Sequence, residues 1–234
     1  VYLQGDAGLL PADVYPMSHT GSQHNDLKAG DLNGDGLDDL VAVSATGPSQ
    51  DNIAVLLQDP LGGFEDEVIY DAPGNRTYDC VAIGDVNNDG LNDLALGAIG
   101  PMLQIFTQTP AGTLEFLDSF DLGLAGFHDS LEIRDLDNDG LNEIIGVSVG
   151  ALVVLNSPAH PGGLAVRETF DLTAENFWAD PHHLAVRDIN ADGLLDVAVA
   201  NIELGGVQLL LSDGVILKDG FESGDTSGWS TVFP

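Results

Sequence analysis

The sequence predicts an all-β protein, a β-propeller-type array of four-stranded antiparallel blades. Three observations support this prediction. An acidic loop occurs four times, and the first aspartates of successive copies are 54, 50 and 53 residues apart. Short apolar stretches, alternating or rich in β-branched residues, flank each copy, and no window has a convincing helical period. A repeat of about 50 residues is the size of one supersecondary unit, and such units arranged around an axis form a propeller.

Each predicted unit begins with a strand that leads into the acidic loop. These four strands end in LKAG, VAIG, LEIR and LAVR. Apolar residues recur in them at every second position, which predicts one buried face for each strand. The equivalent apolar positions are Leu27, Val81, Leu131 and Leu184, followed two residues later by Ala29, Ile83, Ile133 and Val186.

Three further strands are predicted after each loop, because short β-branched runs are separated there by Gly, Pro, Asn and Asp. The fourth unit has only a poor candidate for its last strand. The second strands are expected at 40–45, 94–99, 144–149 and 197–202, the third at 52–59, 102–109, 151–157 and 206–213, and the fourth at 64–71, 114–121 and 164–171.

The two ends of the chain are out of phase with the repeats. Residues 1–17 resemble 55–71, so they are expected to form strands three and four of a partial blade. Residues 18–218 then form four blades, and 219–234 form a C-terminal tail. Two arrangements remain open: the ends pair with each other and close the ring, or they pair with a neighbouring chain. A stacked or open array of the same units is the competing architecture.

The composition narrows the possible functions. Hydrophobic residues make up 44% of the 234, which is enough for a core, yet 38 acidic residues face only 6 Lys and Arg, for a formal charge of −32. Nucleic acid and anionic membranes require basic surfaces, so both are excluded as partners. The single cysteine, Cys80, excludes an intrachain disulfide, and no stretch has the apolar length of a membrane span.

The repeated loop has the spacing D-x-[DN]-x-D-G-x-x-[DE], which predicts a calcium site. Oxygen ligands at positions 1, 3 and 5 curve around one centre, glycine at position 6 allows a sharp turn, position 7 offers a carbonyl, and the acid at position 9 closes the shell. Dense hard-oxygen ligands favour Ca²⁺ over Mg²⁺, and the absence of His and Cys from the loops argues against softer metals. In an EF-hand the closing Glu comes six residues after the glycine rather than three.

One calcium ion is expected in each loop, or about four per chain. Loop three has an additional carboxylate at position 3, which would make it the tightest site, whereas the longer Glu143 would loosen it. The predicted ligands are Asp31, Asn33, Asp35, the Leu37 carbonyl and Asp39; Asp85, Asn87, Asp89, the Leu91 carbonyl and Asp93; Asp135, Asp137, Asp139, the Leu141 carbonyl and Glu143; and Asp188, Asn190, Asp192, the Leu194 carbonyl and Asp196.

With these loops the chain resembles the FG-GAP repeat family, the calcium-loop blades of integrin α-subunit propellers and of many secreted bacterial proteins. The resemblance covers about residues 20–215. It implies that the calcium loops brace the blades and that partners bind on the opposite face. Integrin-type propellers have seven blades, so this chain would be a small propeller, a fragment, or a piece completed by another copy. The segment DGFESGDTSGWS at 219–230 resembles a tail of exported proteins of Gram-negative bacteria.

A second group of polar residues lies at the start of the first strand of each unit. His24, Tyr78, His128 and His182 would gather near the axis, on the face away from calcium. They could form a ligand or transition-metal site. The alternative, which we favour, is that they cap the inner strands, because duplication alone aligns such residues.

These observations predict an extracellular or cell-surface calcium-binding protein of a Gram-negative bacterium, with a structural, adhesive or self-assembling role and no enzymatic activity. Its partners would be calcium, copies of itself joined by strand complementation, and a protein or glycan on the face opposite calcium. The alternative is a carbohydrate-binding or polysaccharide-cleaving propeller, that is, a lectin or a lyase.

Overall fold

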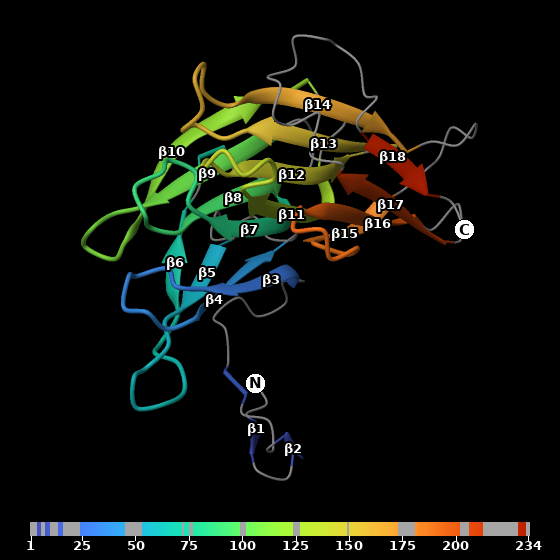
Figure 1. The fold of residues 1–234 in the computed structure, drawn as a ribbon. Helices are drawn as coiled ribbons and strands as arrows, with labels where there is room; N and C mark the ends of the chain where they lie inside the picture. Colours follow the sequence, from blue (N-terminus) through green and yellow to red (C-terminus); the bar gives the residue numbers. More distant parts are fainter. Residues whose placement is uncertain are drawn as a thin grey trace.

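The computed structural model of the protein describes residues 4–5, 8–9, 14–15, 24–44, 53–71, 73–74, 77–98, 102–123, 127–148, 150–172, 181–201, 206–212 and 229–232. These residues form four antiparallel four-stranded sheets, which are the blades of a four-bladed β-propeller (Figure 1). The all-β prediction and the four-stranded repeat are therefore confirmed. A further antiparallel pair of two-residue strands, β1 (Gln4–Gly5) and β2 (Gly8–Leu9), forms a small sheet of its own within the segment 1–17.

The first two blades follow the predicted strand order. Blade 1 consists of β3 (His24–Gly30), β4 (Asp39–Ser44), β5 (Ile53–Leu56) and β6 (Val68–Tyr70). Blade 2 consists of β7 (Tyr78–Gly84), β8 (Asp93–Ala98), β9 (Met102–Gln108) and β10 (Leu114–Asp121). Within each blade, consecutive strands pair with one another, so every blade is a simple meander.

The last two blades repeat this order. Blade 3 consists of β11 (Phe127–Arg134), β12 (Glu143–Ser148), β13 (Ala151–Asn156) and β14 (Ala165–Asp171). Blade 4 consists of β15 (Pro181–Arg187), β16 (Asp196–Asn201), β17 (Gly206–Ser212) and β18 (Trp229–Val232). The outer strand β18 pairs with β17, although it lies within the segment 219–234 that the sequence analysis separates as a tail. Blade 4 therefore takes its fourth strand from the segment that the sequence analysis assigns to the tail.

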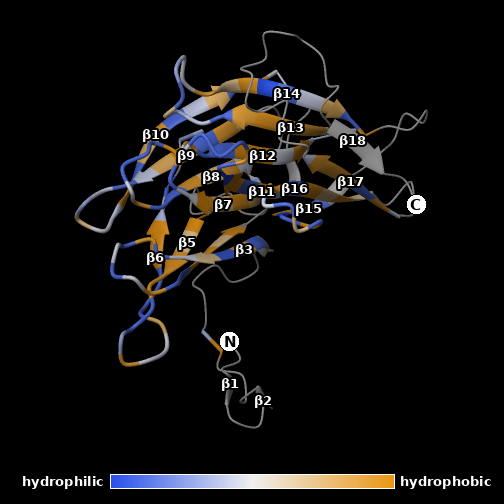
Figure 2. Ribbon diagram, in the orientation of Figure 1, coloured by the Kyte–Doolittle hydropathy of each residue, from blue (hydrophilic) through white to orange (hydrophobic). Residues whose placement is uncertain are grey.

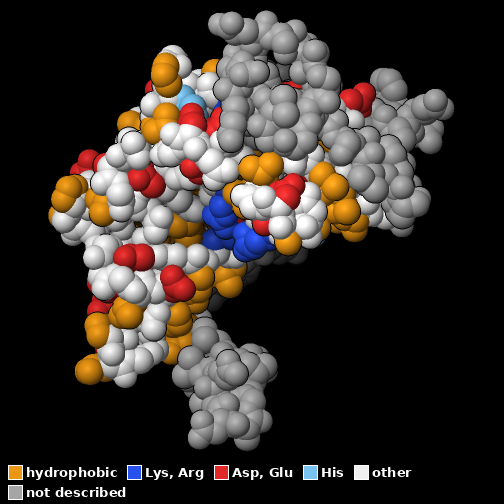
Figure 3. Space-filling view, viewed as in Figure 1, with side chains coloured by type: hydrophobic (Ala, Val, Ile, Leu, Met, Phe, Trp, Pro, Cys, Tyr) orange, Lys and Arg blue, Asp and Glu red, His pale blue; other side chains and the backbone are white. Residues whose placement is uncertain are grey.

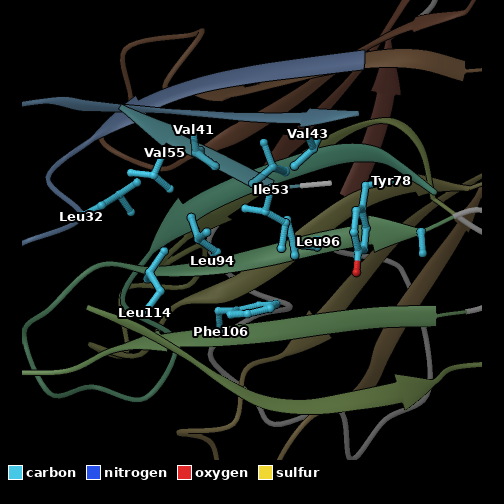
Figure 4. Packing of buried hydrophobic residues seen from close by; sticks show 12 residues of the cluster. Leu32, Val41, Val43, Ile53, Val55, Tyr78, Leu94, Leu96, Phe106 and Leu114 are labelled. Carbon is cyan, nitrogen blue, oxygen red and sulfur yellow. The ribbon is translucent and has the colours of Figure 1, made fainter. Parts of the chain in front are cut away.

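Three apolar clusters hold successive blades together. The first joins blades 1 and 2, with Val41 and Ile53 packed against Leu94 and Leu96 (Figure 4). The second joins blades 2 and 3, and includes the buried Cys80. The third joins blades 3 and 4. The second strands β8 and β12 are buried along their whole length, because a blade packs on each side of them, and Figure 2 shows the apolar strands between hydrophilic loops.

The buried position that recurs in the inner strands is exposed in blade 1. Val81 and Leu131 are fully buried, whereas Leu27 is 57% exposed. The reason is that Val81 and Leu131 pack on the preceding blade, while the core cluster of blade 1 extends only toward blade 2. The sequence pattern is the same in all units, but only a neighbouring blade buries it.

Close packing between inner strands explains two glycines. A Cβ on Gly30 would lie 2.9 Å from Ile83 Cγ2, and a Cβ on Gly84 would lie 2.6 Å from Ile133 Cγ2. Blades 1 and 2 therefore need glycine at the last position of the inner strand, because the next blade fills the space of a side chain. Blades 3 and 4 have Arg134 and Arg187 at this position.

Candidate metal centre

The four acidic loops occupy the same place in every blade. Loop one (31–39), loop two (85–93), loop three (135–143) and loop four (188–196) each connect the inner strand to the second strand. Because the inner strands run side by side and in the same sense, all four loops lie at the same end of the blades. The structure thus places the four copies as equivalent parts of one repeat, as the sequence predicts.

The aspartate at position 1 organises the backbone of each loop. In loop two, Asp85 Oδ1 accepts hydrogen bonds from the N–H of Asn88 at 2.6 Å and of Asp89 at 3.2 Å, and Oδ2 accepts one from Gly90 at 2.8 Å. The bond from the glycine at position 6 recurs at 2.9–3.0 Å in the other loops. In loop one, burial would raise the pKa of Asp31, but four backbone N–H groups outweigh it and lower this pKa below its usual value.

Positions 3 and 5 continue the same turn. Asn87 Oδ1 accepts the N–H of Asp89 at 2.9 Å, and Asp89 Oδ1 accepts the N–H of Leu91 at 2.9 Å. Equivalent bonds are present in loops one, three and four. In these Asx-type turns the side-chain oxygens of positions 1, 3 and 5 accept backbone N–H groups of the loop, and the leucine at position 7 is half-buried.

Two positions in each loop have left-handed backbone. Position 6 is glycine in all four loops, with φ between 84° and 90°. Position 4 is also left-handed: Gly34 has φ 81°, Asn88 61°, Asn138 59° and Ala191 63°. The sequence analysis identified the first of these positions and missed the second, although the preference for Gly and Asn at position 4 was a usable signal. Ala191 adopts this conformation against the preference of an L-residue with a Cβ.

The acid at position 9 is fully buried in every loop. Asp39, Asp93, Glu143 and Asp196 are all 0% exposed. In loop two, Asp93 Oδ2 accepts the N–H of Val86 at 2.9 Å and Oδ1 accepts the N–H of Gln108 at 2.8 Å. The same pair of bonds occurs at Asp39 and Asp196. This carboxylate therefore fastens the start of the loop to the third strand, in addition to closing any metal shell.

Burial makes ionisation of these acids costly. It raises the pKa of Asp93 to about 6, and the nearby charges of Asp89 and Asp85 add to this rise, while the hydrogen bonds from Val86 and Gln108 oppose it. Burial also raises the pKa of Asp39. Each of these loops brings like charges together around a buried carboxylate, an arrangement that a cation stabilises.

Loop three differs because two basic side chains reach it from the same blade. The guanidinium of Arg167, on β14, lies 2.9 Å from Glu143 Oε1 through Nη1 and 2.7 Å from Asp137 Oδ2 through Nη2. His160 Nε2 lies 2.8 Å from the same Glu143 oxygen, and its Nδ1 lies 3.1 Å from the hydroxyl oxygen of Ser157. Sequence reasoning found neither residue, since both lie outside the loop motif.

The donor set fits a hard cation. In loop three, carboxylate oxygens of Asp135, Asp137 and Glu143 lie within 4.8 Å of one another, and a second group combines Asp139, Glu143 and His160. Burial raises the pKa of Glu143 well above its usual range, with the charge of Asp137 adding to the effect and Arg167 and His160 opposing it. The oxygen ligands present in all four loops suit calcium, which remains a prediction.

Neighbouring loops are also linked across the blade boundaries. Asn92 Nδ2, at position 8 of loop two, donates a hydrogen bond of 3.1 Å to the Asp31 carbonyl of loop one. Asn142 Nδ2 of loop three donates one of 2.7 Å to the Asp85 carbonyl of loop two. Sequence analysis assigned no role to position 8. These bonds fix the first residue of one loop against the next blade, so the loops form a connected row.

The predicted polar group at the other end of the inner strands is only partly described. His24 and Tyr78 are the first residues of β3 and β7, and His128 and His182 are the second residues of β11 and β15. The side chains of the three histidines lie outside the described residues. Tyr78 is 1% exposed, and its hydroxyl donates a hydrogen bond to Gln104 Oε1 within blade 2. It therefore belongs to the core between blades 1 and 2, which agrees with a structural role for this position.

Comparison with solved structures shows likeness in fold. A periplasmic gluconolactonase of Pseudomonas aeruginosa superposes with a TM-score of 0.59 at 17% identity, over 99% of this chain and 61% of that one. BBS1N, solved in complex with ARL6DN, gives 0.53 at 11% identity over 86% and 55%. A lectin of Agrocybe aegerita specific for non-reducing terminal N-acetylglucosamine gives 0.52 at 18% identity over 82% and 50%. The chain spans about half to three fifths of the length of these proteins.

Sequence comparisons complete the assignment. No curated protein matches the chain. The part of the chain that the structure describes has no helix long and apolar enough to cross a membrane. Two overlapping segments, 31–96 and 85–146, match the FG-GAP-like repeat family, and they contain loops one to three in full. Over residues 31–146 this chain therefore belongs to the FG-GAP-like repeat family, and the matched repeats form blades of the β-propeller described above.

Proposed function

We propose that this chain is an extracellular calcium-binding propeller protein with a structural or adhesive role, in which calcium neutralises the loops and holds the inner strand to the second strand. One observation carries the proposal. Among the described residues, no Lys, Arg or His side chain pairs with a carboxylate of loops one, two or four, although each contains a fully buried aspartate. A bound divalent cation supplies the missing positive charge, and folding then depends on the metal.

Calorimetry tests this proposal. Melting of the purified chain is measured in 1 mM calcium (about the extracellular level), in chelator, and in chelator with excess magnesium. When the free calcium concentration is 100 times the Kd of a site, binding adds about 2.7 kcal/mol to the free energy of unfolding. Three such sites should therefore raise the melting temperature by about 10 °C or more. Magnesium should not restore the loss, because it retains its waters rather than filling an oxygen cage. Equal melting temperatures in calcium and chelator would remove the proposal.

We also propose that copies of the chain join head to tail. At each internal boundary, the residue after the first aspartate of a loop is fully buried against the following blade, as for Leu32 and Val86. The equivalent Ile189 of blade 4 is 44% exposed, and Val207 on β17 is 52% exposed. Leu27 of blade 1 is 57% exposed. Its equivalents Val81 and Leu131 belong to the clusters that contain Leu32 and Val86 of the preceding blade. The exposed apolar residues of blade 4 would thus pack on the exposed apolar residue of blade 1 in a second copy.

Analytical ultracentrifugation over a range of concentrations tests this association. The wild-type chain should form larger species as its concentration rises, and chelator should reverse this by loosening the blades. Leu27→Glu and Val207→Glu should each shift the distribution to monomer, while Leu61→Glu, which changes an exposed leucine in the turn between β5 and β6, should not. A monomer at every concentration in calcium would contradict the proposal.

A further inference from the structure

The basic residues of this acidic chain are unevenly placed. The sequence has six Lys and Arg against a formal charge of −32. Three of the six, Lys28, Arg134 and Arg187, lie on the inner strands β3, β11 and β15. Figure 3 shows that most of the Lys and Arg surface on this face gathers in one patch near the middle of the molecule. We call these three residues and Glu132 the axial basic patch.

An ion-pair chain connects three members of the patch across the blades. Lys28 Nζ of blade 1 lies 3.6 Å from Glu132 Oε1 of blade 3, and Arg134 Nη2 lies 2.9 Å from Glu132 Oε2. Lys28 reaches past blade 2, where the equivalent residue is the small Ala82. One carboxylate therefore holds two cations, and with Arg187 the patch has a net charge of +2.

The two arginines adopt the same conformation in successive blades. Arg134 Nη1 donates a hydrogen bond of 2.7 Å to the Ile133 carbonyl, and Arg187 Nη1 donates one of 2.7 Å to the Val186 carbonyl. Each guanidinium is thereby held against its own strand with other N–H groups still available. Among the described residues, no carboxylate pairs with Arg187, and its side chain is exposed. A held, unpaired guanidinium is suited to bidentate binding of an oxyanion.

Packing does not account for these arginines. Blades 1 and 2 require glycine at the same position, because the next blade fills the space, whereas Arg134 is half-buried and Arg187 is exposed. Neutralising the loops does not account for them either. Asp135 and Asp188 follow the two arginines directly in the sequence, yet Arg134 pairs with Glu132, and both guanidinium groups bond to carbonyls of their own strands. Isolated exposed cations add little to stability.

The geometry points to the axial basic patch as a binding site for an oxyanion, the carboxylate or phosphate of a small acidic ligand, bound mainly by Arg134 and Arg187. The acidity of the rest of the chain repels anions, so these ligands would bind here and not elsewhere on the surface. The inference goes beyond the calcium proposal and does not require it. Calcium in loops three and four would strengthen anion binding by offsetting Asp135 and Asp188, so the titrations are made with and without calcium.

Titration of the whole chain with three sugars that differ only in the group at C6 tests the site. Glucuronate supplies a carboxylate, glucose 6-phosphate supplies a phosphate, and glucose is the neutral control. Binding is followed by calorimetry and by chemical shifts of the arginine side chains. At least one of the two acids should bind while glucose does not, and the acid that binds more tightly identifies the oxyanion.

Three variants locate the binding. Arg187→Ala should weaken binding about tenfold, because a charge-assisted pair is lost, and Arg134→Ala combined with Arg187→Ala should abolish it. Arg76→Ala, which removes one positive charge from another part of the sequence, should leave affinity unchanged. Circular dichroism confirms that each variant is folded. Failure of both acids to bind the folded wild-type chain overturns the inference, and so does binding that survives in the double variant. Either result leaves the calcium proposal untouched.

Discussion

Loops two and three share one nine-residue pattern and the same turns, yet they treat their buried acid differently. In loop two, the groups that hold Asp93 among the described residues are the backbone N–H groups of Val86 and Gln108. In loop three, Glu143 is held by the side chains of Arg167 and His160 as well as by the Leu136 N–H. We therefore expect loop two to depend on an external cation, whereas loop three carries positive charge of its own. Equal motifs do not imply equal metal affinity.

The extra carboxylate of loop three raised the possibility that it is the tightest calcium site. Arg167 pairs with that same carboxylate, Asp137, at 2.7 Å. A guanidinium in this place offsets the added negative charge and occupies an oxygen that calcium would otherwise use. We therefore expect loop three to be the weakest of the four sites, and loop two to be among the strongest.

The largest effect is expected from Asp93→Ala in loop two. This change leaves two buried N–H groups without an acceptor and removes a carboxylate from the cage, so unfolding should become easier by about 3–5 kcal/mol in calcium. Urea denaturation measures the loss. Asp89→Ala removes the same charge from an exposed position of the same loop and should cost much less. Equal losses would mean that the buried hydrogen bonds of Asp93 contribute little.

The next effect concerns the internal cation of loop three. Arg167→Met keeps most of the side-chain volume but leaves Asp137 and Glu143 without their shared partner, at a cost of about 2–4 kcal/mol in chelator. In calcium the loss should be smaller, because a metal ion can replace the guanidinium, and calorimetric titration should detect tighter binding at this loop. Arg187→Met is the control and should change stability by less than about 0.5 kcal/mol. An identical loss with and without calcium would contradict this view of Arg167.

A smaller effect is the pH dependence of stability that loop two should contribute through Asp93. In metal-free protein the pKa of Asp93 is raised to about 6, above the value of about 4 for an unfolded aspartate. The folded state therefore binds the proton more tightly, so this contribution is present below pH 4 and is lost as the pH rises through 6. The urea midpoint of metal-free wild type should fall between pH 5 and pH 7 more steeply than that of Asp93→Asn. Indistinguishable slopes would exclude Asp93 as the titrating group.

The smallest effect on stability is expected at position 4, where all four loops have left-handed backbone. Ala191→Gly in loop four should stabilise the protein by about 0.5–1 kcal/mol, because it relieves a Cβ at φ 63°. Asn138→Gly at the equivalent position of loop three should change stability by only a few tenths of a kcal/mol, since asparagine tolerates this conformation. Thermal denaturation in calcium measures both. A clear gain at Asn138 as well would show that loop three is strained in its backbone and not only different in charge.

Local patterns predicted much of the candidate site. The period-two apolar positions and the repeated loop placed the inner and second strands, and the structure confirms the blades they form. The residues missed lie away from the motif: His160 and Arg167 are 17 and 24 positions beyond Glu143. They reach loop three because β13 pairs with β12 and β14 pairs with β13. The spacing of residues along the sequence does not reveal these pairings.

By itself the sequence determined the repeat, the strand-forming stretches and the turns of the four loops, because these depend on neighbouring residues: alternation, glycine at position 6 and side-chain oxygens that bond to nearby N–H groups. Only the tertiary structure decided which copies of the pattern are equally buried and equally charged. Contacts between blades bury Val81 and leave Leu27 exposed, and contacts within blade 3 bring Arg167 to one loop and to none of the others described. Burial and charge balance depend on what lies opposite a residue, and that is set when the blades pack.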